Sequence, residues 1–330
     1  MSRLSQWIES GWYGKGPRPW PLLPLAWLTA AVARRRLRRF RAAAETPPVP
    51  VVVVGNVTVG GTGKTPLVVT LCEFFQRNGL RVAVISRGYG VRHATVPFTV
   101  DADGDAATCG DEPLLIAQRT GAPVVIDPRR RRALQYAIDT HKPDVVISDD
   151  GLQHYDLPRT VDIAVVDGQR GLGNGYCLPV GPLREPAERL ALCDWVIING
   201  DEHSSSVDGV IMHLDISDPV NLRSGEAMAL EDFAVRFPVI HAVAGIGNPG
   251  RFFSALEGQG FRVVPHPFPD HHAYAISDFD AFADGIILMT EKDAVKCREL
   301  PLPHAWYLPV AARLPTVLTN DLLEKVRRKQ

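Results

Sequence analysis

A run of four valines that leads into a glycine-rich loop is the feature that most restricts the fold of this chain. Val51–Val54 is typical of a buried strand, and the loop after it ends in Gly63, Lys64 and Thr65. A strand that enters such a turn and continues as a helix directs successive backbone N–H groups toward a polyphosphate. Lys64 would reach the β- and γ-phosphates, and the Thr65 hydroxyl would contact Mg²⁺. We therefore predict a nucleoside triphosphate site.

The predicted nucleotide contacts cover the loop and the start of the helix. Gly60, Gly61 and Gly63 let the backbone approach the phosphates, because they carry no Cβ. The usual pattern of such loops has a glycine where this chain has Thr58. The full set of predicted contacts is Thr58, Val59, Gly60, Gly61, Thr62, Gly63, Lys64, Thr65 and Pro66.

Short apolar runs alternate with helical segments after the proline-rich residues 46–50. The apolar runs lie at 51–54, 81–86, 123–126, 145–148, 162–166 and 195–199, and the main helical segments at 66–78, 111–119 and 129–141. Uninterrupted apolar runs are typical of parallel strands that are covered on both faces. The pattern predicts a doubly wound, mostly parallel α/β fold of the P-loop NTPase type.

A second, smaller α/β pattern starts after the polar stretch 201–237, which we interpret as a connection. It begins with Val239–Ala244 and a helix at about 251–259, and later apolar runs continue it. We expect three parts: an N-terminal segment 1–46, a core domain 47–236 and a smaller lobe 237–330. The cleft between the two lobes is the natural substrate site.

The composition excludes some classes of protein and partner. The formal net charge is −1, which argues against a general nucleic-acid binder, and no obligatory protein partner is evident. The five cysteines are scattered without a Cys-x-x-Cys pair. We interpret them as reduced residues of a cytosolic protein, with neither a zinc site nor a disulfide framework.

The amino terminus combines basic and aromatic residues. Residues 1–46 contain nine Lys or Arg against two Glu, and the apolar stretch Trp20–Ala33 precedes a cluster of arginines. This stretch is shorter than the roughly 20 apolar residues of a spanning helix and contains Pro21 and Pro24. Tryptophans beside arginines favour contact with an anionic leaflet. A secretory signal and a helix packed on the protein's own core are the competing interpretations.

Several acids and bases are candidates for the chemistry. Residues 145–148 form an apolar run that ends in Asp149 and Asp150, as in a Walker B segment that holds Mg²⁺, and Asp149 is the better ligand. Asp111 and Glu112 begin a helix, where they either cap it or activate an acceptor hydroxyl. His271 is a catalytic candidate or part of an ordinary loop, and a metal site of histidines is less favoured because no partner has a suitable spacing.

Further charged residues have both plain and functional interpretations. One of the four consecutive arginines at 129–132 could face an anionic substrate, although such a run also suits a solvated helix start. Arg184 and Glu185 lie in a proline-rich loop and could form only a surface ion pair. Thr290 and Glu291 are explained by helix capping.

The order of these motifs resembles one family. The segments that carry the resemblance are the Trp-rich basic amino terminus and residues 55–66, 86–90, 110–113, 149–155, 173–175, 183–185, 270–271 and 290–296. Together they cover nearly the whole chain and resemble the tetraacyldisaccharide 4′-kinases, the lipid A kinases of Gram-negative bacteria. The threonine at position 58 is itself similar to the loop of this family, so it does not count against the resemblance.

The resemblance implies ATP-dependent phosphorylation of the 4′-hydroxyl of a tetraacylated glucosamine disaccharide 1-phosphate, which gives lipid IVA. It also implies a peripheral or monotopic enzyme on the cytoplasmic face of the bacterial inner membrane, with ATP and Mg²⁺ as cofactors. Asp111 looks like the general base, paired with His271 across the cleft. The implied metal contacts are Thr65, Asp149, Asp150 and Glu185, and the implied substrate contacts are Glu112, Arg130, Gln153, His154 and Arg184.

A deviant-Walker ATPase that acts as a membrane-associated conformational switch is the main alternative. Such proteins have a loop similar to residues 60–65 but carry an additional lysine, and Val59 occupies that position here. A GTPase is less favoured, because the sequence has no Asn-Lys-x-Asp motif after a late strand. A switch ATPase would respond to a protein partner, whereas the kinase would turn over ATP only with a lipid acceptor.

Overall fold

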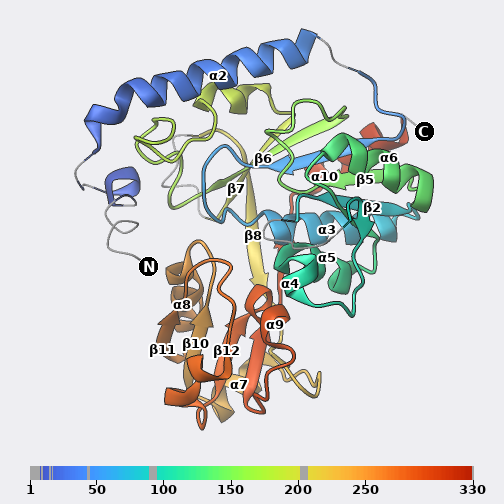
Figure 1. The fold of residues 1–330 in the computed structure, drawn as a ribbon. Coiled ribbons are helices and arrows are strands. Elements are labelled where there is room, and N and C mark those ends of the chain that lie inside the picture. Colours follow the sequence, from blue (N-terminus) through green and yellow to red (C-terminus); the bar gives the residue numbers. More distant parts are fainter. Residues whose placement is uncertain are drawn as a thin grey trace.

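The computed structural model places two sheets in two lobes, with a long helix across the larger one (Figure 1). It describes residues 18–42, 45–88, 95–200 and 207–328, together with 8, 10–14 and 16. Parts of three predicted segments lie outside the described residues: Arg3, Trp7 and Lys15 of the basic amino terminus, Tyr89 and Gly90, and residues 201–206 of the predicted connection.

The larger lobe is built on a nine-stranded sheet. In spatial order its strands are β14 (Val310–Arg313), β8 (Val210–Ile216), β7 (Trp195–Asn199), β6 (Val161–Asp167), β1 (Val51–Gly55), β5 (Val145–Ser148), β2 (Val82–Ser86), β4 (Val124–Ile126) and β3 (Phe98–Thr99). Neighbouring strands are parallel except for the pairs at the two edges, β14–β8 and β3–β4. The predicted P-loop type of α/β fold is confirmed.

Helices cover both faces of this sheet, which explains the uninterrupted valines of β1. Val52 and Val54 pack in the same cluster as α3 (Lys64–Arg77), α5 (Asp111–Thr120) and α10 (Thr316–Arg327). Val51 and Val53 point to the other face, toward α6 (Arg130–His141). Because successive side chains of a strand alternate between faces, every position of β1 is buried.

A long amphipathic helix lies over the α6 side of the sheet. It is α2 (Leu23–Ala42), which follows the short turn η1 (Trp20–Leu22) and contacts η2 (Ala187–Leu192) through an Arg34–Glu188 ion pair (Figure 1). Pro21 and Pro24 were expected to interrupt this segment. They instead lie in η1 and in the first turn of α2, where a missing N–H costs nothing, so the helix runs on for 20 residues.

The smaller lobe is built on a five-stranded sheet. Its order is β11 (Arg262–Pro267), β10 (Val239–Ala244), β12 (Ile287–Thr290), β13 (Ala305–Leu308) and β9 (Val220–Asn221), and only β9 is antiparallel to its neighbour. Its helical elements are α7 (Leu230–Arg236), α8 (Pro249–Gly258), η4 (Ile276–Asp278), η5 (Asp280–Phe282) and α9 (Glu291–Cys297), and the larger lobe adds α4 (Ala106–Cys109).

The sheets do not follow the predicted division at residue 237. β9 precedes this residue but belongs to the smaller sheet, while β14 and α10 leave the smaller lobe and return to the larger one. The stretch 201–237, which we expected to be only a connection, supplies β8 to the larger sheet and β9 to the smaller. We therefore propose that residues 310–327 belong with the core domain.

Candidate active site

A cavity of about 980 Å³ lies where the two lobes face each other. The core lines it with the phosphate loop, the end of β5 and the start of α5. The smaller lobe contributes the turn before α8, the loop at Asp270 and His271, and the start of α9. Loops at the carboxyl ends of parallel strands are the usual ligand site of such sheets, and the cavity lies there.

The phosphate loop is fixed at its end by a strand of the core. Gly63 has a φ of +89°, and a Cβ on it would lie 2.3 Å from the side-chain nitrogen of Asn199. That nitrogen donates a 3.0 Å hydrogen bond to the Thr62 carbonyl. α3 then begins at Lys64, as the strand–loop–helix pattern predicts. The cavity is lined by Val59 to Pro66, whereas Thr58 is buried and bridges to Leu183.

Asp149 and Asp150 follow β5 and have opposite electrostatic environments. Burial raises the pKa of Asp149, and the charges of Glu112 and Asp150 raise it further. Burial would also raise the pKa of Asp150, but the charges of Lys64 and Arg184 outweigh it and lower the pKa to about 2. Lys64 Nζ lies 3.5 Å from Asp150 Oδ1. Among the described residues, Asp149 forms no ion pair, and the charges of Lys64 and Arg130 offset its burial only in part.

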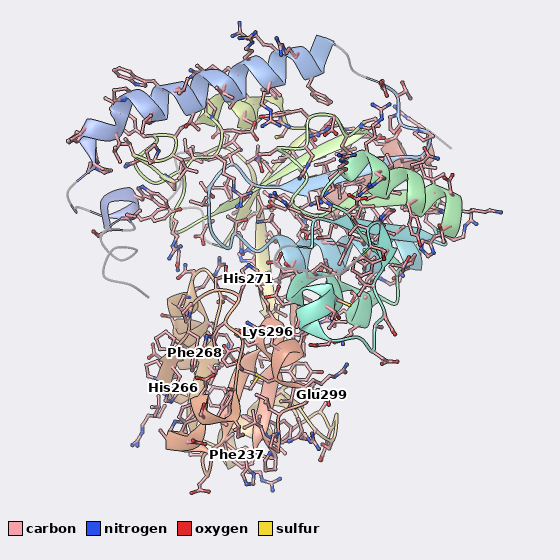
Figure 2. All side chains as sticks on the ribbon, viewed as in Figure 1. Phe237, His266, Phe268, His271, Lys296 and Glu299 are labelled. Carbon is pink, nitrogen blue, oxygen red and sulfur yellow. The ribbon has the colours of Figure 1, made fainter. Side chains whose placement is uncertain are left out.

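Asp111 and His271 come from different lobes and meet in the cavity. His271 Nδ1 lies 2.9 Å and 3.2 Å from the two carboxylate oxygens of Asp111, and Figure 2 places His271 at the edge of the smaller lobe that faces the core. Because an ionised carboxylate only accepts hydrogen bonds, Nδ1 is the donor. Burial would raise the pKa of Asp111, but this hydrogen bond and the charge of Lys292 hold it at about 2. The same bond raises the pKa of His271.

Only one of the four consecutive arginines lines the cavity. Arg130 is 1% exposed and donates to the carbonyls of Asp127 and Asp149. Arg131 pairs with Glu45, and Arg132 pairs with Asp127. The start of α6 therefore orients Arg130 alone toward the end of β5.

The remaining predicted substrate residues surround this cluster. Gln153, His154, Arg184 and Glu112 all line the cavity. Arg184 donates 2.9 Å to Asp150 and 3.3 Å to the Gln153 side-chain oxygen. Burial and the charge of Arg130 lower the pKa of His154 to about 4, so this imidazole is neutral at physiological pH.

Glu185, a predicted metal contact, lies beneath this surface. Its carboxylate accepts hydrogen bonds from Gln153 Nε2 at 2.6 Å and from the Tyr155 hydroxyl, and it lies 3.6 Å from Arg189. Gln153 Nε2 also donates to the Asn56 carbonyl. The position of Glu185 therefore suits a role through Gln153 rather than direct contact with a ligand.

Sequence reasoning missed three residues that join the lobes at the site. Arg251, at the start of α8, donates to the side-chain oxygen of Asn199 at 2.9 Å. Lys292 lies among the acids at the start of α5. Asn199 ends a parallel strand, which was a usable signal, but the contacts of Arg251 and Lys292 join residues far apart in the chain.

Comparisons with known proteins agree with this architecture. Residues 18–327 match the family model described as tetraacyldisaccharide-1-P 4′-kinase. The chain is 52% identical to the tetraacyldisaccharide 4′-kinase of Alcanivorax borkumensis over 331 residues, which is 100% of both chains. The chain belongs to the tetraacyldisaccharide 4′-kinase family. It is also 50% identical to the enzyme of that name from Pseudomonas fluorescens, over 94% of this chain and 93% of the relative.

A solved structure supports the same assignment. The tetraacyldisaccharide 4′-kinase of Aquifex aeolicus, crystallised in complex with ATP, matches with a TM-score of 0.75 and 26% identity, over 93% of this chain and 98% of that chain. Membership of the tetraacyldisaccharide 4′-kinase family confirms the prediction of an ATP-dependent kinase that acts in lipid A biosynthesis, and with it the choice against a switch ATPase.

Proposed function

We propose that Asp111 and His271 activate the 4′-hydroxyl of the tetraacyldisaccharide while the loop from Val59 to Thr65 holds the triphosphate of ATP. The hydrogen bond that joins Asp111 of the core to His271 of the smaller lobe supports this most directly. It lies in the same cavity as the phosphate loop, so an acceptor beside Asp111 would face the nucleotide. Phosphoryl transfer depends chiefly on this alignment and on charge neutralisation.

Lys64 is the proposed contact to the β- and γ-phosphates. Its ammonium lies 3.5 Å from Asp150, so it would exchange this carboxylate for phosphate oxygens when ATP binds. Arg184, 2.9 Å from the other oxygen of Asp150, continues to neutralise that acid. After this exchange the partly exposed Asp150 carboxylate would still have one cationic partner.

Asp111 is the proposed base. One oxygen of its carboxylate accepts the proton of the 4′-hydroxyl, while the Nδ1–H of neutral His271 stays hydrogen-bonded to the carboxylate and orients it. A carboxylate with a pKa of about 2 is a weak base, so it takes the proton as the bond from the hydroxyl oxygen to phosphorus forms and makes that proton acidic. This assignment requires His271 to be neutral when the acceptor binds.

The residues around Asp149 fit Mg²⁺. Asp149 Oδ1 is buried and accepts no hydrogen bond within the part of the chain that the structure describes, while Ser86 donates to Oδ2 at 3.3 Å. Carboxylate, hydroxyl and phosphate oxygens are the ligands that Mg²⁺ prefers. We propose that Thr65 and Asp149 hold the ion, with Asp150 beside them and Glu185 acting through Gln153. Bound Mg²⁺ would neutralise charge that develops on the transferred phosphoryl group.

In this proposal the acceptor extends from the Asp111–His271 pair along the core side of the cavity. Arg184 and Gln153 would orient the sugar, and Arg130 would hold the backbone of the Asp149 turn and contribute positive charge. Neutral His154 can donate or accept a hydrogen bond from a hydroxyl. Glu112 would lie beside the acceptor next to Asp111.

We place the enzyme on the cytoplasmic face of the inner membrane, held by α2. Among the described helices, none is long and apolar enough to cross a bilayer. Leu25, Leu28 and Val32 are exposed at the spacing of one helical face, and Trp20 and Trp27 are exposed as well. Because each acyl CH₂ costs about 0.8 kcal/mol to transfer to water, the kinase must approach its substrate at the bilayer.

The test is transfer of ³²P from γ-labelled ATP to detergent-solubilised tetraacyldisaccharide 1-phosphate. The wild type should label the lipid only with Mg²⁺, and Lys64→Ala should lose the labelling. Without acceptor, release of free phosphate should be slow. If free phosphate is released rapidly at a rate that does not depend on the acceptor, and no lipid is labelled, the proposal is overturned and the alternative of a switch ATPase is favoured.

A further inference from the structure

Lys292 joins the two lobes at the point where Asp111 meets His271. It is the second residue of α9, and its ammonium lies 2.9 Å from Glu112 Oε1 and 3.1 Å from Asp270 Oδ1. The same ammonium lies 3.7 Å from Asp111 Oδ2. One partly buried cation therefore contacts Asp111 itself and the immediate chain neighbour of each member of the Asp111–His271 pair.

The backbone of His271 needs such support. Its φ of +59° lies in the left-handed region, which is unfavourable for a residue with a side chain. The Asp270 carboxylate accepts a 3.0 Å hydrogen bond from the His271 N–H, through the oxygen that also accepts from Lys292. Unfavourable backbone conformations persist only where the surroundings hold them. Lys292 thus fixes the carboxylate that holds His271 in place.

Charge gives Lys292 a second effect on the pair. The ammonium favours the ionised form of Asp111 and therefore lowers the pKa of its carboxyl group. It also opposes protonation of His271 and therefore lowers the pKa of that imidazole. Lys292 itself stays charged, because burial lowers its pKa less than the surrounding carboxylates raise it. The charged groups around the pair are Glu112 on α5, Asp270 in the loop, and Lys292 and Lys296 on α9.

We propose that Lys292 is a positioning residue that holds Asp111 and His271 in register across the two lobes. This inference rests on the proposed function of that pair. Helix capping explains Thr290 and Glu291 at the start of α9, but it gives no reason for a partly buried ammonium among three carboxylates. A lysine that only bound ATP phosphates would instead change the KM for ATP and leave the pair unaffected.

Glu291 offers a matched control. It is adjacent to Lys292 on α9 and also ties the smaller lobe to α5, through two hydrogen bonds of 2.8 Å and 2.9 Å from Arg119. Within the described part of the chain, Glu291 makes no hydrogen bond or ion pair with Asp111, Asp270 or His271. Glu291→Gln therefore weakens an ion pair between the lobes without removing charge beside the Asp111–His271 pair.

The experiment compares kcat, the KM for ATP and the pH profile of kcat in Lys292→Met, Lys292→Arg and Glu291→Gln. Lys292→Met should lower kcat by about tenfold or more, because misplacement of a base removes part of its typical 10²–10⁴-fold contribution. The KM for ATP should change less than about threefold, as expected when ground-state binding is retained. In Lys292→Met, the fall of kcat on the acid side of the pH profile (the acid limb) should move to higher pH, since the loss of a positive charge raises the pKa of His271. Lys292→Arg should keep the limb at the wild-type midpoint.

Three results would overturn the inference. The first is an acid limb of Lys292→Met that stays at the wild-type midpoint. The second is an acid limb of Glu291→Gln that moves as far as the limb of Lys292→Met. The third is a change in Lys292→Met that affects the KM for ATP alone. If Lys292→Met does not fold, a shifted limb in Lys292→Arg overturns the inference on its own. Full activity of Asp111→Asn would instead remove the proposed function, whatever Lys292 does.

Discussion

Gly247 of the smaller lobe lies directly against Gly61 of the phosphate loop. A Cβ on Gly247 would stand 2.5 Å from the Gly61 backbone nitrogen and 3.2 Å from its Cα. Arg170 of the core fixes the same turn through a 3.1 Å hydrogen bond to the Gly247 carbonyl. The smaller lobe therefore contacts the backbone that is proposed to hold the phosphates. We expect nucleotide binding to depend on how closely the two lobes approach.

Gly247→Ala should weaken ATP binding. The added methyl group must displace either the phosphate loop or the smaller lobe, and overpacking of this kind costs about 1–3 kcal/mol, or roughly tenfold in affinity. The dissociation constant for ATP checks this. Gly250→Ala is the control, because the nearest atom to its Cβ would be the Asn248 side-chain oxygen at 3.8 Å. Equal affinity in both variants would contradict the proposed contact.

Asp149 and Asp150 should respond in opposite ways to loss of their charge. Asp149 is buried beside other acids, so Asp149→Asn should raise the free energy of unfolding of the nucleotide-free protein by about 1 kcal/mol or more. Asp150 has cationic partners, so Asp150→Asn should lower it, by at most about 1 kcal/mol because the pair is partly solvated. Chemical denaturation in EDTA measures both, and equal signs would be inconsistent with the assigned environments.

Asp149→Asn should also increase the Mg²⁺ concentration that half-saturates the kinase. The Asp149 carboxylate, whose Oδ1 accepts no hydrogen bond from the described residues, would become a neutral amide, which is a poorer ligand for a hard cation. Titration of phosphoryl transfer with Mg²⁺ measures this, and an unchanged half-saturation would place the ion elsewhere.

The kcat of the wild type should fall on the acid side as His271 becomes protonated. The hydrogen bond to Asp111 raises the pKa of His271, so the midpoint should lie above the ordinary value of about 6.5. Imidazolium beside Asp111 makes the carboxylate a weaker base, and activity is therefore lost as pH falls through that pKa. In His271→Gln this limb should disappear. His272→Gln, whose imidazole pairs with Asp278 instead, should keep it.

The exposed apolar face of α2 should govern binding to membranes. The double variant Trp27→Glu/Leu28→Glu should lower partition onto vesicles that contain anionic lipid by about tenfold or more, because each large side chain contributes about 1.5–3 kcal/mol when fully buried. Vesicle flotation measures the partition. Val235→Glu alters an even more exposed apolar residue on the smaller lobe and should leave the partition unchanged. Equal loss in both would rule out α2 as the contact.

The core of the site could be predicted because its signals are local. Four buried valines, three glycines and the Lys64–Thr65 pair specify a strand, a loop and a helix within 16 residues of sequence. The acids after β5 follow from the same logic, since parallel strands bring their carboxyl ends to one edge. Arg130 could not be separated from its neighbours, because the direction of each side chain depends on where α6 begins.

The path of the chain between lobes could not be predicted. β13 ends at Leu308 and β14 begins at Val310, so the chain changes sheets across Pro309 alone. No change in composition marks this point, and the partner of β14 is a strand about 95 residues earlier. The same limit applies to Lys292, whose partner Glu112 is 180 residues away. Pairing between distant segments depends on the assembled fold rather than on local pattern.

The most direct test of the proposed mechanism is the activity of Asp111→Asn. The amide keeps the size of the carboxylate but cannot accept the hydroxyl proton, so kcat should fall by about 10²–10⁴-fold. The dissociation constant for ATP, measured on the same protein, should stay within about threefold, since Asp111 is proposed to act on the acceptor. A variant that binds ATP normally but transfers phosphate hundreds of times more slowly is the predicted result. Near-normal kcat in Asp111→Asn would contradict the account.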